Sequence, residues 1–169
     1  MDVEEAIRTR RTSKVFATNP VTPETLQELL ELARWAPNHH LTQPWRFRVL
    51  GPQSLARLKE AAGPEAATKL ERAPTLIVSS ARLTGEPERD EEDLHATAVA
   101  TYIVLLGAHA RGLAGYWRTP AVLRTPQGRE AVGMEADERF VGLVHLGAPR
   151  QEREPPPRGE PETFVAWLP

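Results

Sequence analysis

The sequence predicts a single domain of mixed helices and strands, and three observations lead to this fold class. The 169 residues fit one domain, which is large enough to bury roughly two-thirds of its unfolded surface. A hydrophobic content of 40% and a charged content of 26% are ordinary for a folded protein. Segments with helical spacing of apolar residues are interspersed with short β-branched or alternating runs, without an internal repeat or a second domain.

The first half of the chain carries clear helix and strand signals. Val3 to about Arg11 suits a short helix, with Asp2 as its N-cap. Thr22 followed by Pro23 starts a second helix, whose apolar residues recur at helical spacing until Pro37 stops it. The remaining elements predicted here are a half-buried strand at 45–50, helices at 53–62 and 65–72, and a central strand at 75–79.

The second half is predicted to begin with a polar surface loop at residues 82–92. A long helix follows from about Glu91 to Arg111. It is apolar on all sides from Ala98 to Ala108, so we expect it to be buried in a core or in an interface. The last predicted elements are a short extended segment at 115–119, a helix from 125 to about 133 and a strand at 140–147.

The C-terminal segment is expected to dock onto another surface. Three consecutive prolines, Pro155 to Pro157, precede the apolar stretch Phe164–Leu168. An apolar terminus after a polyproline spacer cannot fold alone. We therefore expect it to contact either the core of its own chain or a partner subunit.

Composition excludes several classes of function. Without cysteine the chain has no disulfide, thiolate zinc site, iron–sulfur cluster or cysteine nucleophile, so redox chemistry would need a dissociable organic cofactor. A net charge of -2 argues against non-specific nucleic-acid binding as the main function. The longest apolar run, 96–110, is shorter than the ~20 residues of a membrane span, and no secretory signal is recognised, so we expect a cytoplasmic protein.

The first candidate site lies where the predicted N-terminal helix ends. Arg10, Arg11, Thr12 and Ser13 place two guanidinium groups and two hydroxyl groups together, which suits binding of a phosphate or ribityl group. The same residues are compatible with a solvated basic helix end, which is the commoner outcome for such spacing, or with a nucleic-acid-binding arm. This cluster alone does not decide between them.

The second candidate site is the polar segment from Asn38 to Gln43, which leads into Trp45 and the first predicted strand. Its imidazole and amide groups suit the surroundings of a flat ring. Together with the arginine cluster, it therefore indicates a phosphate-bearing planar cofactor, for which a flavin is the best candidate. His39 and His40 would point in different directions and have no third ligand nearby, so a metal site is not expected. Alternatively, Asn38 and Gln43 only satisfy the turn, and Trp45 belongs to the core.

The third candidate site is Trp117-Arg118-Thr119, an aromatic ring, a guanidinium and a hydroxyl group in succession. Its simpler interpretation is a strand end with a core Trp and an exposed Arg. Motifs of other reaction classes are absent from the sequence: it has no G-x-S-x-G elbow, no P-loop and no G-x-G-x-x-G. The isolated histidines His95, His109 and His145 are expected to be structural, with satisfied hydrogen bonds.

The three clusters together resemble the FMN-dependent nitroreductase family, specifically its compact subgroup. Ile7 to Thr12 resembles the RRS start of the family, with Thr in place of Ser. Ala36 to Phe47 is similar to its AP-x-x-x-x-x-QPW-x-F segment, the most specific of the three. Gly115 to Thr119 resembles its G-x-W-R-S stretch, and Gly142 to Gly147 its last core strand. The resemblance covers nearly the whole chain.

This resemblance implies an α+β, nitroreductase-like fold over residues 1–169, in which helices surround a central, mostly antiparallel sheet. It further implies an intertwined homodimer with FMN at the subunit interface. Larger members often hold the phosphate with a basic residue near the C-terminus, for which Arg150, Arg153 and Arg158 are the candidates here. The implied cofactor contacts are Arg10, Arg11 and Thr12 of one chain, Trp35 and His39 of the other, and Trp117, Arg118 and Thr119, with Gln43 and Trp45 supporting the ring.

The implied activity is an NAD(P)H-dependent oxidoreductase that acts by ping-pong hydride transfer. FMN would accept hydride from NADH or NADPH and pass electrons to a nitroaromatic, a quinone or a similar electrophile. No catalytic side chain or metal is expected, and a guanidinium near the flavin pyrimidine would stabilise the reduced anionic ring. The alternatives are a same-fold flavoprotein for reductive dehalogenation or flavin breakdown, a non-enzymatic flavin-binding protein, and a nucleic-acid-binding protein.

Overall fold

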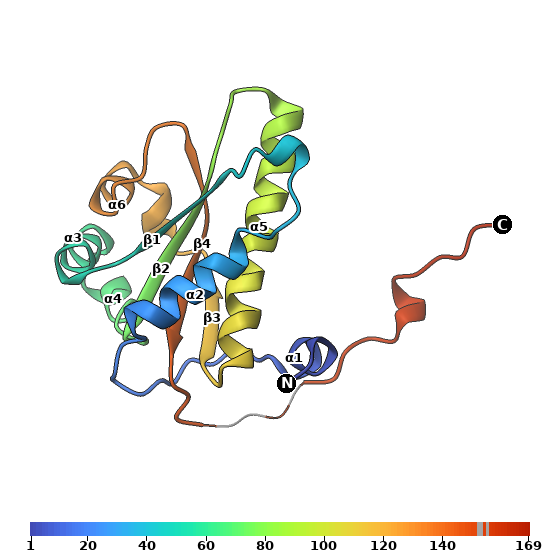
Figure 1. Cartoon of the computed structure of the whole chain (residues 1–169). Coiled ribbons are helices and arrows are strands. Elements are labelled where there is room, and N and C mark those ends of the chain that lie inside the picture. Colours follow the sequence, from blue (N-terminus) through green and yellow to red (C-terminus); the bar gives the residue numbers. More distant parts are fainter. Residues whose placement is uncertain (152–153, 155) are drawn as a thin grey trace.

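Four strands form the central sheet of the computed structural model, in the order β1-β2-β4-β3 (Figure 1). The structure describes residues 1–151, 154 and 156–169, so Arg153 and Pro155, both named above, lie outside the described residues. All three strand pairings are antiparallel, which confirms the α+β fold implied by the sequence. The strands are β1 (Trp45–Val49), β2 (Thr75–Arg82), β3 (Ala114–Arg118) and β4 (Glu138–Gly147).

Six α-helices and three short 3-10 helices accompany the sheet within the described residues. Their starts agree with the sequence, because the side chains of Asp2, Thr22 and Thr125 accept hydrogen bonds from backbone N–H groups of the first turn. The elements are α1 (Val3–Thr9), α2 (Pro23–Ala33), η1 (His39–Leu41), α3 (Pro52–Ala62), α4 (Pro64–Ala67), α5 (Pro87–Ala110), η2 (Ala121–Arg124), α6 (Pro126–Ala131) and η3 (Pro161–Thr163).

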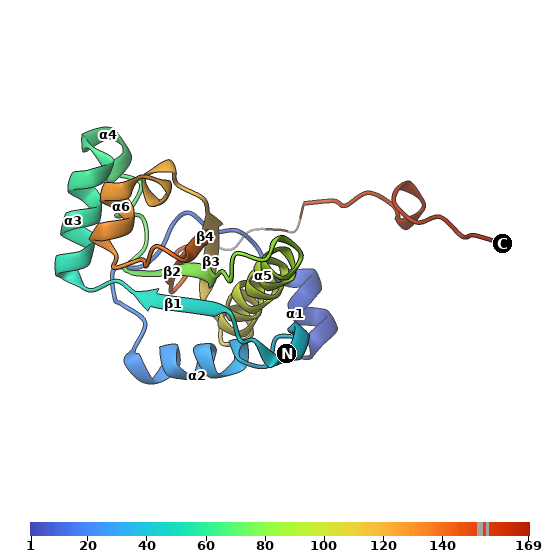
Figure 2. The same ribbon diagram turned by 90° about the horizontal axis from the view of Figure 1, so that it is seen from above.

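Helices cover both faces of the sheet, so the molecule has three layers (Figure 2). Helices α3 and α6 lie on one face, over a core that includes Leu58 and Val78. Helices α2 and α5 lie on the other face, over a core that includes Leu29 and Ile77. Neighbouring strand residues point to opposite faces, which is why Ile77 and Val78 belong to different cores.

Two predicted helices are shorter than expected, each for a local reason. Helix α1 ends at Thr9 rather than Arg11, because the chain becomes extended at Arg10 and then pairs with β3. Helix α4 ends at Ala67 rather than continuing to Arg72. After Ala67 the backbone tightens into turns, in which the N–H groups of Lys69 and Leu70 donate to the carbonyls three residues earlier, those of Ala66 and Ala67.

The predicted loop at 82–92 is wrong in its second half, because α5 begins at Pro87. The Asp90 carboxylate accepts hydrogen bonds from the backbone N–H groups of Thr84 and Gly85, at 2.7 and 3.1 Å. These bonds, above all that from Thr84, hold the pKa of Asp90 below its usual value. Acidic residues in the first turn also complement the helix dipole. The polarity that suggested a loop therefore belongs to a helix start.

Helix α5 has one covered and one open side. Ala100, Val104 and Ala108 are fully buried against the sheet. On the outer side Val99 is 40% exposed, and Tyr102 and Leu106 are only half-buried. The long apolar helix is therefore buried in a core along one side, as predicted, while its other side presents apolar groups at the surface of the single chain.

The C-terminal segment extends away from the rest of the chain, beyond α1 (Figure 1). Phe164 is 75% exposed and Trp167 93% exposed. Docking on the core of the same chain, one of the two expected outcomes, is therefore wrong. Docking on a partner subunit stays a prediction.

Candidate functional site

The first and third sequence clusters lie side by side. After α1 the chain runs along β3, and a parallel bridge joins Thr12 to Gly115. The Ser13 backbone N–H donates to the Gly115 carbonyl at 3.1 Å. The segment that follows Arg11 and the segment that precedes Trp117 thus form one edge of the sheet, although about a hundred residues separate them in sequence.

Two cationic side chains of these segments lie close to the ring of Tyr116. The Lys14 ammonium lies 5.6 Å and the Arg118 guanidinium 6.0 Å from the centroid of the Tyr116 ring. Arg118 also donates to the Lys69 carbonyl at 3.1 Å, which ties β3 to the chain after α4. Sequence analysis did not assign a role to Lys14 or Tyr116. Their only sequence signal was proximity to the two predicted clusters.

Arg10 and Arg11 have hydrogen-bonding capacity that the described residues do not use. The Nε atoms of both guanidinium groups are shielded from solvent and have no hydrogen-bond partner there. Neither guanidinium forms an ion pair within the described part of the chain. Arg10 instead lies over the Tyr102 ring of α5, 5.6 Å from its centroid. Both side chains are half-buried, and a shielded Nε–H group without a hydrogen-bond acceptor is costly unless a ligand supplies one.

A hollow that we call the arginine hollow connects these cations with the C-terminal segment. Arg10, Arg11 and Thr12 line it together with Glu154, Pro156 and Arg158. Of the three basic C-terminal residues named above, Arg158 therefore lies at this site. Arg150 is exposed at the start of the C-terminal segment. Its backbone N–H donates a hydrogen bond to the Val15 carbonyl at 3.4 Å.

Trp117 and Thr119 differ from Arg118 in their surroundings. The Trp117 ring occupies the space that a side chain at Gly142 would fill, and its Nε1 donates to the Val141 carbonyl at 3.3 Å. The ring belongs to the core on the α5 side, whereas Arg118, one residue later, points to the opposite face. Thr119 is exposed just beyond the strand. Only Arg118 of this cluster directs a cation toward Tyr116.

The second cluster forms a turn that is strained and tightly tethered. His40, Leu41 and Gln43 all have positive φ angles, of 51°, 53° and 46°. The Asn38 side chain accepts a hydrogen bond from the Gln43 backbone N–H at 2.9 Å. The Thr42 hydroxyl donates to the buried carboxylate of Asp93 at 2.6 Å, which fixes the turn to α5.

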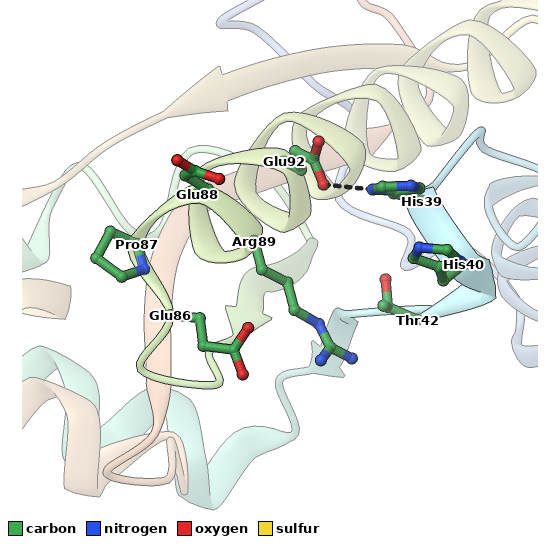
Figure 3. Close-up of a pocket in the computed structure, with 8 residues that line it drawn as sticks. All are labelled: His39, His40, Thr42, Glu86, Pro87, Glu88, Arg89 and Glu92. Atoms are coloured by element: carbon green, nitrogen blue, oxygen red, sulfur yellow. Dashed lines mark hydrogen bonds and ion pairs between the residues drawn. The ribbon is translucent and has the colours of Figure 1, made fainter.

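A cavity of about 670 Å³ opens between this turn and the first turns of α5 (Figure 3). The rings of His39 and His40 stack with their centroids 4.0 Å apart, and Nδ1 of His39 lies 2.7 Å from a Glu92 carboxylate oxygen. Figure 3 shows Arg89 reaching into the space between η1 and the helix start. The cavity is lined by His39, His40, Thr42, Glu86, Pro87, Glu88, Arg89 and Glu92.

The other three predicted residues of this region, Trp35, Gln43 and Trp45, lie outside that cavity. Trp35, just after α2, is 73% exposed. The Arg34 guanidinium lies over its ring, 5.6 Å from the ring centroid. Gln43 is exposed beyond η1. Trp45 is half-buried and packs against the core on the α5 side. An exposed indole such as that of Trp35 is available to a partner chain.

The structure does not bring His39 to Arg10 within one chain. His39 contacts Glu92 near the start of α5, whereas Arg10 contacts Tyr102, ten residues farther along that helix. At 1.5 Å per residue, these two points on the helix are about 15 Å apart. Figure 1 shows η1 and α1 beside opposite ends of α5. The two halves of the predicted site therefore face different regions of the surface.

Two of the isolated histidines also have distinctive surroundings. Nε2 of His109 lies 2.9 Å from the Thr9 hydroxyl, and burial together with Arg10 and Arg11 lowers the pKa of this imidazole. His145 is fully buried beside Tyr116, and neither ring nitrogen has a partner among the described residues. The expectation that His145 has satisfied hydrogen bonds is therefore wrong. Its position between β2 and β3 in the middle of the sheet was not evident from sequence.

Comparisons with known proteins agree with this fold and these motifs. The model of the Nitroreductase family matches residues 7–69. A relative from Escherichia coli K12, provisionally named NAD(P)H nitroreductase YdjA, is 30% identical over 165 residues, which cover 89% of this chain and 90% of the relative. The chain belongs to the nitroreductase family. Members of this family are oxidoreductases.

Solved structures of the nitroreductase fold superpose on nearly the whole chain. A nitroreductase-like family protein from Bacillus cereus has a TM-score of 0.90 at 23% identity, covering 99% of this chain and 96% of the other. A provisionally named nitroreductase from Desulfovibrio desulfuricans, solved in complex with FMN, has a TM-score of 0.80 at 25% identity. It covers 99% of this chain and 98% of that one.

The described residues contain neither a membrane-spanning helix nor a metal-binding group of side chains. No helix there is both long and apolar enough to cross a membrane. No group of three or more His, Cys, Asp or Glu side chains in the same part of the chain is arranged to hold a metal ion.

Proposed function

We propose that this nitroreductase-family protein is an FMN-dependent NAD(P)H oxidoreductase of nitroaromatics, quinones or similar electrophiles, and that it acts as a homodimer. The observation that carries the proposal is the pair of half-buried arginines, Arg10 and Arg11, whose Nε atoms are shielded from solvent without a hydrogen-bond partner and which form no ion pair among the described residues. A phosphate-bearing cofactor supplies that anion. The family membership and the FMN complex of the Desulfovibrio desulfuricans relative make FMN the best candidate.

The residues around the arginine hollow fit FMN. Arg10, Arg11 and Arg158 offer guanidinium donors for a phosphate, and the Thr12 hydroxyl offers one more. Lys14 and Arg118, which both lie close to the Tyr116 ring, offer positive charge for the reduced flavin ring. We assign Arg10, Arg11, Thr12 and Arg118 to direct cofactor contact, and Trp117 to the packing that holds β3 in place.

A second copy of the chain would complete the site. Because η1 and Arg10 lie at opposite ends of α5, a twofold axis across the outer side of α5 would bring the partner's His39 toward the Arg10 of this chain. The apolar groups on that side, including Val99, support such an interface. The exposed Trp35 and the C-terminal segment with Trp167 would then contact the partner subunit.

The protein residues in this proposal bind, orient and exclude water. When bound, FMN supplies the two-electron chemistry, taking hydride from NADH or NADPH and returning it to the electron acceptor. Arg118, which is half-buried, would stabilise negative charge on the reduced ring, because a cation in a partly buried site acts at reduced dielectric; the exposed Lys14 would contribute less. The cavity between η1 and the start of α5, which His39 lines, offers a place for the substrate beside the ring.

The proposal is tested on the purified full-length protein. We expect a yellow preparation whose chromophore is released by denaturation and identified as FMN by mass, and NAD(P)H oxidation with nitrofurazone or menadione in ping-pong kinetics. A colourless protein that does not take up FMN after reconstitution contradicts the proposal. A protein that binds FMN but does not oxidise NAD(P)H would instead be a flavin-binding protein of the same fold.

The homodimer is tested separately by sedimentation of the FMN-loaded protein. We expect a mass of two chains and a stoichiometry of one FMN per chain. A fully active monomer contradicts the two-chain site, even if the FMN assignment is correct.

A further inference from the structure

His109 lies near the end of α5, in contact with the short helix that carries Arg10. Its Nε2 is 2.9 Å from the Thr9 hydroxyl oxygen. That hydroxyl has a single proton, which it donates to the Glu5 carbonyl at 2.5 Å. The imidazole must therefore donate from Nε2 to Thr9. In the neutral state Nδ1 is then the unprotonated nitrogen, which is free to take up a proton.

His109 lines a cavity of about 380 Å³ that adjoins the arginine hollow. The two spaces share Arg11, Thr12 and Glu154. Arg10 and Arg158 line only the arginine hollow, whereas His109 lines only the adjoining cavity. The remaining walls of the cavity are Met1, Thr9, Ser13, Gly112, Leu113, Ala114, Pro149 and Gln151.

Charged groups on every neighbouring segment act on this imidazole. Arg10 and Arg11 oppose its protonation and Glu5 of α1 favours it. The Met1 terminus and the Glu154 carboxylate lie at the same cavity, with opposite charges. Burial is the largest influence, and together with the two arginines it places the pKa of His109 below 6.5.

We propose that His109 is a further member of the anion site of Arg10, Arg11 and Thr12, and that its protonated imidazolium stabilises the phosphate group held there. This inference rests on the proposed function, because the phosphate is that of FMN. An anion that neutralises Arg10 and Arg11 removes the repulsion that these two arginines add to the effect of burial on His109. Binding of the phosphate and protonation of His109 must then favour each other.

The test compares cofactor affinity of the wild-type protein and a His109→Gln variant at two pH values. Glutamine can still donate a hydrogen bond toward Thr9 but cannot take up a proton. We expect equal FMN affinities, within about twofold, near pH 8, and about fivefold tighter FMN binding by the wild type near pH 5.5. Comparing the proteins at one pH cancels the titration of the FMN phosphate itself. Riboflavin, which lacks the phosphate, should show no difference at either pH.

A His95→Gln variant is the matched control, because His95 is exposed on the same helix. It should bind FMN like the wild type at both pH values. A wild-type protein that fails to bind FMN near pH 8 contradicts the proposed function. FMN binding in which the His109→Gln variant keeps the same ratio to wild type at both pH values overturns only the role of His109.

Nuclear magnetic resonance of the imidazole C–H groups gives a second readout, measured on the wild-type protein itself. The signal absent from His109→Gln identifies His109 in the wild-type spectrum. We expect its titration midpoint to lie below pH 6.5 without cofactor and to rise when FMN, but not riboflavin, is added. An unchanged midpoint with FMN bound overturns the inference.

Discussion

Acidification should destabilise this protein through one buried imidazole, that of His145. The side chain is fully buried near the C-terminal end of β4, which lies between β2 and β3, and neither ring nitrogen has a partner among the described residues. Burial, followed by repulsion from Arg118 and Arg72, lowers the pKa of His145 from 6.5 to about 4. The folded chain therefore keeps this residue neutral over a pH range in which the unfolded chain protonates it.

The sign and the size of the effect follow from these two pKa values. A group whose pKa is lower in the folded state contributes stability that is complete above pH 6.5 and is lost as pH falls toward about 4. One pKa unit corresponds to about 1.4 kcal/mol, so the complete loss is about 3 kcal/mol. By pH 4.5 about 2.5 kcal/mol of it would have been lost.

The perturbation is His145→Leu, which keeps an apolar side chain of similar size and removes the titratable group. Urea unfolding at a fixed protein concentration gives the free energy of unfolding near pH 7.5 and near pH 4.5. The wild type should lose about 2.5 kcal/mol more than the variant between these pH values. Near pH 7.5 the variant should be at least as stable as the wild type, because two unpaired polar atoms are no longer buried.

Two results would refute this reasoning. If His145→Leu loses as much stability on acidification as the wild type, the imidazole is not the group responsible. If the variant is less stable by more than about 2 kcal/mol near pH 7.5, the imidazole makes hydrogen bonds that its surroundings in the single chain do not provide. His95→Gln, at an exposed position, should behave like the wild type.

Three other predictions concern the core, the cofactor site and the interface. Glu138→Gln should lower the free energy of unfolding by about 3 kcal/mol near pH 7 in urea titrations, because it leaves the Arg48 guanidinium, 2.8 Å from the carboxylate, without its counter-charge. A double variant, Arg48→Met with Glu138→Leu, should recover most of that loss, and a loss that persists would contradict the ion-pair explanation. Arg10→Ala should weaken FMN binding about tenfold in fluorescence titrations or shift the flavin potential, since it removes a charge-assisted donor; unchanged affinity and potential would count against its assignment. Deletion of residues 160–169 should raise the dimer dissociation constant at least about tenfold in sedimentation experiments, because it removes the exposed Phe164 and Trp167. Equal dimer affinity would show that the segment does not contact the partner.

The stability that Glu138 contributes should also depend on pH. Burial raises the pKa of this carboxyl, but hydrogen bonds from Arg48 and Ser80 and the charge of Arg48 outweigh burial and hold it below the usual value of 4.5. The stability contributed by this carboxylate is therefore present above pH 4.5 and is lost as pH falls below it. Its loss lies at lower pH than most of the loss caused by His145.

Local chemistry was sufficient to place most elements. The caps at Asp2 and Thr22 depend only on neighbouring residues, and both formed as the sequence predicts. The run at 75–79 is β-branched and apolar, which is why a central strand could be expected there. The start of α5 was missed because its first turn is as polar as a loop. Only the bonds from Thr84 and Gly85 to Asp90 distinguish the two.

The amino-acid sequence by itself determined the family, the α+β class and the three polar clusters, because each depends on residue types at short spacing. Only the tertiary structure decided which clusters meet. The Thr12–Gly115 bridge joins the first and third, while α5 separates the Arg10 end from the His39 end by about 15 Å. It also decided that Trp117 packs in the core while Arg118 faces Tyr116, and that Arg158 lies by Arg10. These are contacts between residues far apart in sequence, and they depend on strand pairing and helix packing that no local pattern encodes.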